Sequence, residues 1–388
     1  MHLKKENLKR FCRRWLPTVI GTTVLFITAC VLQRTPIPKI NPRNGVFYEK
    51  AVVTQILEEQ LETDGFSGSQ TGKQQVLVTI KSGHFKGESF PVTNYANYSD
   101  NVVCQVGTRL IVSVTVSSQS TTASIYTYDR TLPLIGLFAV FCLVLCLVGG
   151  KKGLKALFSL AFTFFCILFL FIPLLYRGIS PVPAAIGLSA VVSTSILTWI
   201  DGWNTKSAAA IISTVVCVSL AGAFSSVAGA ISHISTFNMD AMDQLIVVCR
   251  QSDLQIKGLS FAVILLACLG AVVDMSMSIS SSLHEIYLHT PQLSRLALFK
   301  SGMRVGRDMM GTMASTLLLA FTAGYLSTMI LLFSYDVTLY EIFSMPSVVS
   351  EIIQGLAGSI GVFLNVPVTS YVTAYLLTRH HKTASSAI

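Results

Sequence analysis

Asp274 lies inside a long apolar stretch, Leu259 to Ser282, and is the residue of this chain best placed to do chemistry. An ionisable side chain at membrane depth costs roughly 2.5–3.5 kcal/mol on insertion scales, so it normally faces protein or water and has a function. The residues that share its helical face recur at steps of three and four: Gly270, Asp274, Ser278, Ser281 and Glu285. We therefore expect a polar stripe inside a helical bundle, with Asp274 as a carboxylate that could bind and release a proton.

A second polar face follows along the sequence. Arg307 and Asp308 precede another apolar stretch, in which Asp308 shares a helical face with Gly311, Thr312 and Ser315. Two adjacent helices of this kind would bring Arg307 near Asp274 or Glu285. Either the charges form a structural ion pair, or one of them is a protonation site. We expect the structural role for Arg307 and Asp308, near the interface, and the protonation role for the deeper Asp274.

A third stripe lies near the C-terminus, and its members are mostly small or polar: Glu351, Gly355, Gly358, Val362, Asn365 and Thr369. Pro367 interrupts the backbone hydrogen bonds of the same stretch. Small residues on one face usually allow close helix packing. A helix interrupted by Gly and Pro and carrying Asn is also typical of the broken helices of transporters. Both interpretations stay open for this stripe.

Motifs for catalysis or cofactor binding are absent from the sequence. No phosphate-binding GxxxxGK[ST] loop, HExxH, GxSxG or paired-cysteine pattern occurs. We therefore expect no enzyme activity, no cofactor and no metal site. A chain without a phosphate-binding loop cannot itself use ATP, so any transport would be driven by a gradient or by a partner.

The composition is that of a membrane protein. Mean hydropathy is +0.63 and only 12% of the residues are charged, about half the share in a soluble domain. The net charge of +9 does not indicate nucleic-acid binding, because the basic residues fall at the ends of apolar stretches. Eight stretches are long enough to span a membrane: 15–32, 132–148, 154–175, 182–200, 208–231, 259–282, 313–333 and 352–377.

The distribution of Lys and Arg predicts the orientation. Sixteen of these residues fall on the side of the basic N-terminus, residues 1–14, and three fall in the opposite loops other than residues 33–131. Basic residues stay in the cytoplasm. We therefore expect both termini to be cytoplasmic, an anchor helix at 15–32, an extracytoplasmic segment at 33–131, a seven-helix bundle at 132–378 and a cytoplasmic tail at 379–388. The residues before Cys30 also resemble a lipoprotein cleavage box, although seven further spans make a lipid anchor redundant.

The extracytoplasmic segment has the alternation of β-strands. Val76, Val78 and Ile80 alternate with polar residues, and residues 109–116 alternate again after Gly107. About five short strands predict a small barrel or sandwich of the OB or SH3-like kind. Cys104 and Cys249 both fall on the extracytoplasmic side, where they could pair or remain free.

Several of these stretches resemble the YibE/F-like family of bacterial multi-pass membrane proteins. The matching segments are GHFKGESFPVTN at 83–94, residues 149–160, residues 172–181, GAVVDMSMSISSSLHE at 270–285, SGMRVGRDMMGTMAST at 301–316 and GSIGVFLNVP at 358–367. Ala314 and Ser315 depart from the family pattern, in which a polar Asn-type residue is more usual. The resemblance implies a protein of the bacterial plasma membrane and brings no assigned activity.

Together these patterns favour a gradient-driven, proton-coupled transporter or permease for an ion or small solute. Asp274 would be the coupling carboxylate, with Ser278, Thr312 and Asn365 as polar lining. The alternative is a membrane scaffold or regulatory subunit whose outer domain binds an envelope partner. The expected partners are the lipid bilayer, a solute or an envelope protein, and no nucleic acid; a homo-oligomer stays open.

Overall fold

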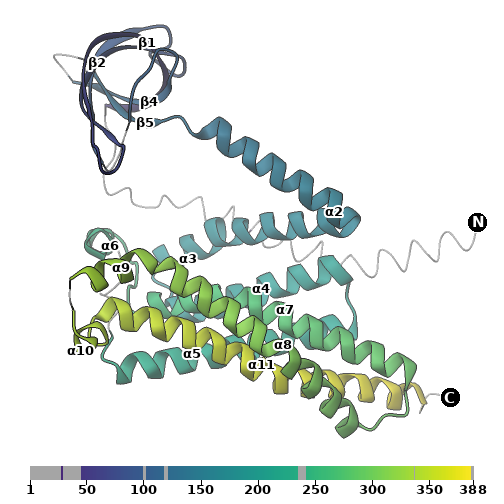
Figure 1. Cartoon of the computed structure of the whole chain (residues 1–388). Coiled ribbons are helices and arrows are strands. Elements are labelled where there is room, and N and C mark those ends of the chain that lie inside the picture. Colours follow the sequence, from purple (N-terminus) through teal and green to yellow (C-terminus); the bar gives the residue numbers. More distant parts are fainter. Residues whose placement is uncertain are drawn as a thin grey trace, which may run out of the picture. The chain divides into compact units, whose positions relative to one another are not determined.

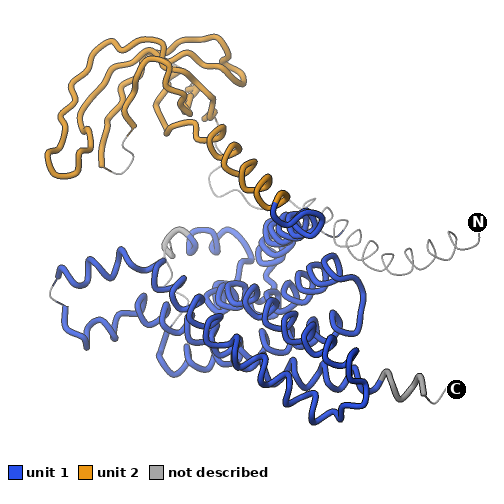
Figure 2. Tube along the Cα trace, turned by 45° about the vertical axis from the view of Figure 1, so that its right-hand side comes forward, with its two compact units in different colours: residues 1–40, 148–388 blue, residues 41–147 orange. Residues whose placement is uncertain are grey.

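The protein is described by a computed structural model that covers residue 28 and residues 45–98, 102–117, 121–234, 242–335 and 337–385. The chain divides into two compact units (Figure 2): residues 41–147, and residues 1–40 with 148–388. The expected anchor helix at 15–32 lies outside the described residues except for Thr28, and so does Cys30.

The first unit contains a curled antiparallel sheet of five strands (Figure 1). The strands are β1 (Val46–Thr63), β2 (Gln70–Ile80), β3 (Ser89–Ala96), β4 (Arg109–Val116) and β5 (Thr121–Tyr128), in the order β3-β2-β1-β4-β5. The long central strand β1 carries two register shifts against β2, and such bulges bend a strand. The edge strands β3 and β5 contact each other as a result of the curl. The predicted β segment is therefore present, as a half-barrel.

Alternation along the strands builds the core of the sheet. Val76, Val78 and Ile80 of β2 are fully buried and alternate with half-exposed neighbours, as the sequence predicts. Cys104 is buried among them with a free thiol, and desolvation raises the pKa of this thiol to about 11. Cys249 is also free and belongs to the other unit, so the structure contains no disulfide between the two.

A glycine turn packs against a buried carboxylate of β1. Glu49 is buried, and its carboxylate accepts hydrogen bonds from the Ser82 hydroxyl (2.9 Å) and the His84 backbone N–H (3.1 Å). Gly83 lies between these donors with φ +70°, and a Cβ there would overlap the Glu49 carboxylate. Only glycine meets both requirements at this turn.

The second unit is helical. Its elements, together with the helix that links the two units, are α2 (Thr131–Cys166), the π-helical turn η1 (Ile167–Phe171), α3 (Ile172–Tyr176), α4 (Pro181–Asp201), α5 (Thr205–Ile231), α6 (Met242–Arg250), α7 (Leu259–His289), α8 (Arg295–Gly324), α9 (Leu326–Ser334), α10 (Leu339–Ile342) and α11 (Pro346–Ser385). Helices α5, α7 and α11 pack against one another, and α4 and α8 flank them.

Five helical runs among the described residues are long and apolar enough to span a membrane, or six if the bent pair α8–α9 counts as one span. The chain is therefore a membrane protein, but the count of eight spans is not confirmed. The expected spans 132–148 and 154–175 fall in one run, Thr131–Tyr176, which is broken at Gly150 by non-helical backbone angles (φ 52°, ψ −133°). The expected span 313–333 begins earlier, at Arg295, and bends by 57° between α8 and α9.

Candidate functional site

Glycines allow the central helices of the bundle to approach closely. A Cβ at Gly361 of α11 would lie 3.1 Å from the Cβ of Ala221 on α5. A Cβ at Gly306 of α8 would overlap Val366 of α11 and lie 3.1 Å from Ile279 of α7. The small residues of these faces therefore serve packing, as in other membrane helices.

Four buried polar side chains meet where α5, α7 and α11 pack together. The Thr214 hydroxyl donates to Ser276 Oγ (3.1 Å), which donates to Asn365 Oδ1 (2.9 Å). The Thr369 hydroxyl donates to the same Oδ1 (2.7 Å). Asn365 Nδ2 donates to the backbone carbonyl of Val272 (2.8 Å). We call Thr214, Ser276, Asn365 and Thr369 the polar cluster; all four are 0% exposed.

Further buried hydroxyls continue along α5 and α11. Ser213 of α5 and Ser370 and Thr373 of α11 are buried, and their hydroxyl oxygens have no hydrogen-bond partner among the described residues. His284 Nδ1 of α7 is likewise without one. Buried polar atoms are nearly always hydrogen-bonded, so such a group usually marks a site that binds water or another polar species.

The predicted stripe on α11 faces the interior of the bundle. Gly355, Gly358, Val362, Asn365 and Thr369 are all buried, whereas Ile352 and Phe363 on the other side of the helix are exposed. The polar cluster forms one part of this stripe. Glu351 begins it, about 21 Å from Asn365 along the helix axis at 1.5 Å per residue.

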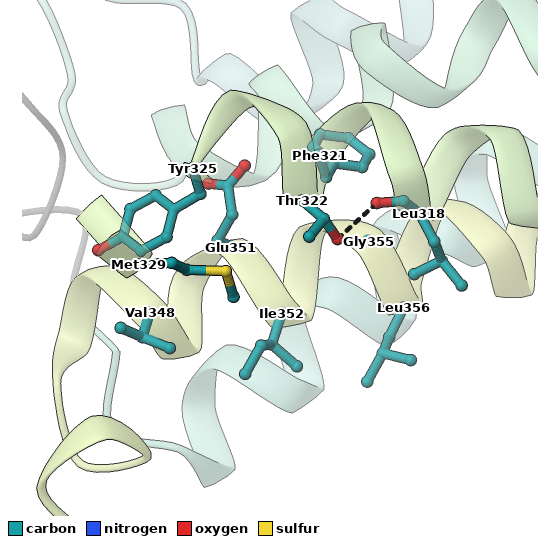
Figure 3. Close-up of a pocket in the computed structure, with 10 residues that line it drawn as sticks. All are labelled: Leu318, Phe321, Thr322, Tyr325, Met329, Val348, Glu351, Ile352, Gly355 and Leu356. Carbon is teal, nitrogen blue, oxygen red and sulfur yellow. Dashed lines mark hydrogen bonds between the residues drawn. The ribbon is translucent and has the colours of Figure 1, made fainter. Parts of the chain in front are cut away.

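Glu351 lines a pocket of about 140 Å³ at the bend between α8 and α9. Figure 3 shows its side chain pointing from α11 toward α8, next to Phe321 and Tyr325. The carboxylate is half-buried, and most of the pocket wall is apolar. The Tyr325 hydroxyl donates to Ser347 Oγ (2.8 Å), which fixes the bend to the first turn of α11. The structure thus places a carboxylate in a mostly apolar pocket beside the break between α8 and α9.

The predicted stripe on α7 does not face the interior. Gly270, Asp274 and Glu285 are exposed, and Ser278 and Ser281 are half-exposed. The buried polar face of α7 instead carries Ser276 and Ser280. Both sets of residues have helical spacing, so the pattern alone could not decide which of them faces the other helices. Asp274 was expected to lie inside the bundle, but it is exposed on the bundle that the described residues form.

The second predicted stripe is exposed as well. Arg307, Asp308 and Thr312 lie on the outer side of α8. Helices α7 and α8 meet through Gly302 and Gly306, which contact Leu283 and Ile279. Within the described part of the chain, no ion pair joins Asp274 or Glu285 to Arg307; Glu285 pairs with His289 on its own helix (3.4 Å).

Sequence reasoning missed Thr214 and Ser276, which contribute two of the four side chains in the polar cluster. Serine and threonine in membrane helices often bond their own backbone, so their presence indicates no particular partner. The spacing of Ser276 and Ser280 by four residues was the only available indication. The described residues contain no group of three or more His, Cys, Asp or Glu side chains that could hold a metal ion.

Comparison with known proteins gives one match. The family model described as YibE/F-like protein matches residues 137–379, which includes every helix from most of α2 to the greater part of α11. No curated protein and no solved structure is similar enough to this chain to count as a match. Since the matched region covers more than half of the chain and contains the polar cluster and the Glu351 pocket, this protein belongs to the YibE/F-like family.

Proposed function

We propose that the protein is a gradient-driven, proton-coupled transporter or permease for an ion or small solute. The observation that carries this proposal is the half-buried carboxylate of Glu351 in a pocket at the bend of a broken helix. Discontinuous helices place binding sites inside the membrane in many transporters. Glu351 belongs to the apolar run Pro346–Arg379, and carboxylates within such runs are rare and usually functional. The proposal therefore assigns proton coupling to Glu351 in preference to Asp274.

The polar cluster supplies a second candidate binding site, on the same face of α11 as the Glu351 pocket. Asn365 and the hydroxyls around it offer oxygen atoms and N–H groups to a polar solute. Pro367 follows two residues later and cannot donate a hydrogen bond to the carbonyl of Phe363, so α11 is weakened beside the cluster. A helix weakened at this position can bend during transport.

Between the Glu351 pocket and the polar cluster, leucines of α8 pack against glycines of α11. Leu318 fills the space beside Gly355, where a Cβ would lie 3.0 Å from Leu318 Cδ2. Leu317 does the same beside Gly358, at 2.8 Å. A transported solute would require these leucines to move away from α11, and a hinge motion at the bend between α8 and α9 would allow α8 to do so.

The alternative function, a scaffold or regulatory subunit, is favoured by a different observation. Asp274 and Asp308 point away from the described bundle, and charged groups on a membrane helix require protein or water around them. A partner protein or a second copy of the chain bound at this side of α7 and α8 would meet that requirement. In this case Asp274 and Asp308 would act in assembly, and Glu351 would have no role in flux.

The proposed transporter also has a proposed membrane topology. We infer eight spans in a bacterial plasma membrane, with both termini in the cytoplasm and an extracytoplasmic β domain of the OB or SH3-like kind. Two of the eight spans come from the run that breaks at Gly150. With this orientation, the Glu351 pocket lies toward the outer surface, and the buried hydroxyls of Ser370 and Thr373 lie toward the cytoplasm.

A flux screen tests the proposal. The full-length protein is reconstituted in liposomes that contain a pH-sensitive dye, and a panel of ions and small anions is offered from outside under an imposed proton gradient. A transporter gives solute-dependent proton movement for at least one member of the panel. Proton movement that is the same as in empty liposomes, across the whole panel, would favour the scaffold function.

A further inference from the structure

The β domain carries a cationic pocket that neither transport nor the polar cluster uses. The pocket has a volume of about 360 Å³, and its polar wall contains Lys50, Lys81 and Arg109 together with a single acid, Asp129. The apolar part of its wall comes from Leu132 and Ile135 in the first turns of α2. All of these residues belong to one compact unit.

The strand register explains how the cations come together. Ala51 of β1 pairs with Ile80 on one side and Leu110 on the other, and these three side chains are buried. Their neighbours Lys50, Lys81 and Arg109 therefore point to the opposite, outer face of the sheet. The Lys81 backbone N–H donates to the Lys50 carbonyl (2.7 Å), which holds the two lysines side by side.

The charge of the pocket contrasts with that of its domain. Residues 45–130 contain six basic and eight acidic residues, so half of the basic side chains converge on one pocket of an acidic domain. Lys50 pairs with Asp129 (3.3 Å). Lys81 and Arg109 are exposed and have no acidic partner among the described residues. The pocket thus keeps two uncompensated positive charges.

The apolar wall indicates what kind of anion fits. Leu132 and Ile135 are 63% and 59% exposed and begin the run Thr131–Tyr176 that is apolar enough to span a membrane. A ligand in this pocket therefore meets cations on one side and the start of a membrane helix on the other. Phosphate is well matched to lysine and arginine donors. Basic residues at a membrane surface attract anionic headgroups.

We propose that the pocket formed by Lys50, Lys81 and Arg109 binds a phosphate-type anion, and that this anion is the headgroup phosphate of an anionic lipid whose acyl chains lie along Leu132 and Ile135. Lys81 and Arg109 contact the phosphate, and Lys50 remains bound to Asp129. The lipid holds the β domain at the membrane surface beside the first turn of α2.

The test uses the full-length protein in nanodiscs of phosphatidylcholine alone or with phosphatidylglycerol, followed by mild detergent extraction and native mass spectrometry of the retained lipid. The site variant is Lys81→Gln with Arg109→Gln. The matched control is Lys73→Gln with Lys86→Gln, which removes the same charge from the same domain outside the pocket. Circular dichroism and a thermal melt establish that each variant is folded, and Lys81→Arg, which keeps the charge, serves as a second variant.

We expect the wild-type protein and the control to retain phosphatidylglycerol over phosphatidylcholine, and the site variant to lose this preference about tenfold or more. Lys81→Arg should keep it. A second arm adds inorganic phosphate and glycerol 1-phosphate to protein in phosphatidylcholine. Binding of these anions that depends on Lys81 and Arg109, without enrichment of phosphatidylglycerol, would keep the phosphate site and overturn the lipid assignment. Equal lipid and phosphate binding by the wild-type protein and the site variant would overturn the proposal entirely.

Discussion

Replacement of Asn365 by alanine should destabilise the bundle more than any other single polar deletion in α11. The side chain is fully buried and takes part in three hydrogen bonds, from Ser276, from Thr369 and to the Val272 carbonyl. Hydrogen bonds between membrane helices contribute about 0.6 kcal/mol each on average. Two of the three bonds join α11 to α7, and the third, from Thr369, lies within α11. Their loss, together with the small cavity left behind, gives an expected loss of about 2–3 kcal/mol in the free energy of unfolding.

The measurement is unfolding of the purified protein in mixed micelles with increasing dodecyl sulfate, followed by circular dichroism. Ser315→Ala is the matched control, because the Ser315 hydroxyl is exposed and bonds only to Gly311 O of its own helix (2.7 Å). The control should change stability by less than about 0.5 kcal/mol. In a double-mutant cycle, Thr369→Ala should cost little once Asn365 is already alanine. A loss below about 0.5 kcal/mol for Asn365→Ala would refute the assignment of the polar cluster as a coupling point of α5, α7 and α11.

Three further predictions address the topology, the exposed acid and the β domain. A cysteine introduced at Ser69 should be labelled by an impermeant reagent on intact cells, whereas one at Thr383 should not; labelling at Thr383 would require an odd number of spans. Asp274→Asn should change the free energy of unfolding by no more than about 0.5 kcal/mol, because Asp274 is exposed and has no ion pair among the described residues; a large loss that Arg307→Gln restores would show that the two are paired after all. Residues 45–130, expressed alone, should give a β-type circular dichroism spectrum and a cooperative melt. Cys104 is the only cysteine of this fragment, and burial raises its pKa to about 11. Alkylation of Cys104 at pH 8 should therefore accelerate at least about 100-fold when the fragment unfolds. Fast labelling of the folded fragment would contradict the burial of Cys104.

The sequence predicted the β domain and the α11 stripe well, for physical reasons. Strands buried on one face alternate at every second residue, so Val76, Val78 and Ile80 indicate both the strand and its inner face. On α11, glycine and asparagine are unfavourable toward lipid and useful between helices, so Gly358 and Asn365 identify the inner face.

Helix phase and helix breaks were harder to predict. On α7 both the face of Asp274 and the face of Ser276 have a period near 3.6, and the choice depends on where α5 and α11 pack, which is a property of the whole bundle. The mean hydropathy of a sequence window also gives no sign of the kink at Gly150 or of the 57° bend between α8 and α9. The pocket at this bend, and with it the position of Glu351, depends on such tertiary features and emerged only from the structure.

The role of Glu351 in proton coupling is tested most directly by a paired current measurement on a solid-supported membrane. Proteoliposomes with the wild-type protein and with Glu351→Gln are exposed to the same solute and the same pH step, with Glu88→Gln in the exposed turn of the β domain as the control. We expect a solute-dependent transient current for the wild-type protein and the control. Glu351→Gln should lose at least about 90% of this current, because a neutral amide cannot carry the coupled proton. An unchanged current in the folded Glu351→Gln protein would contradict the assignment of Glu351 as the coupling carboxylate.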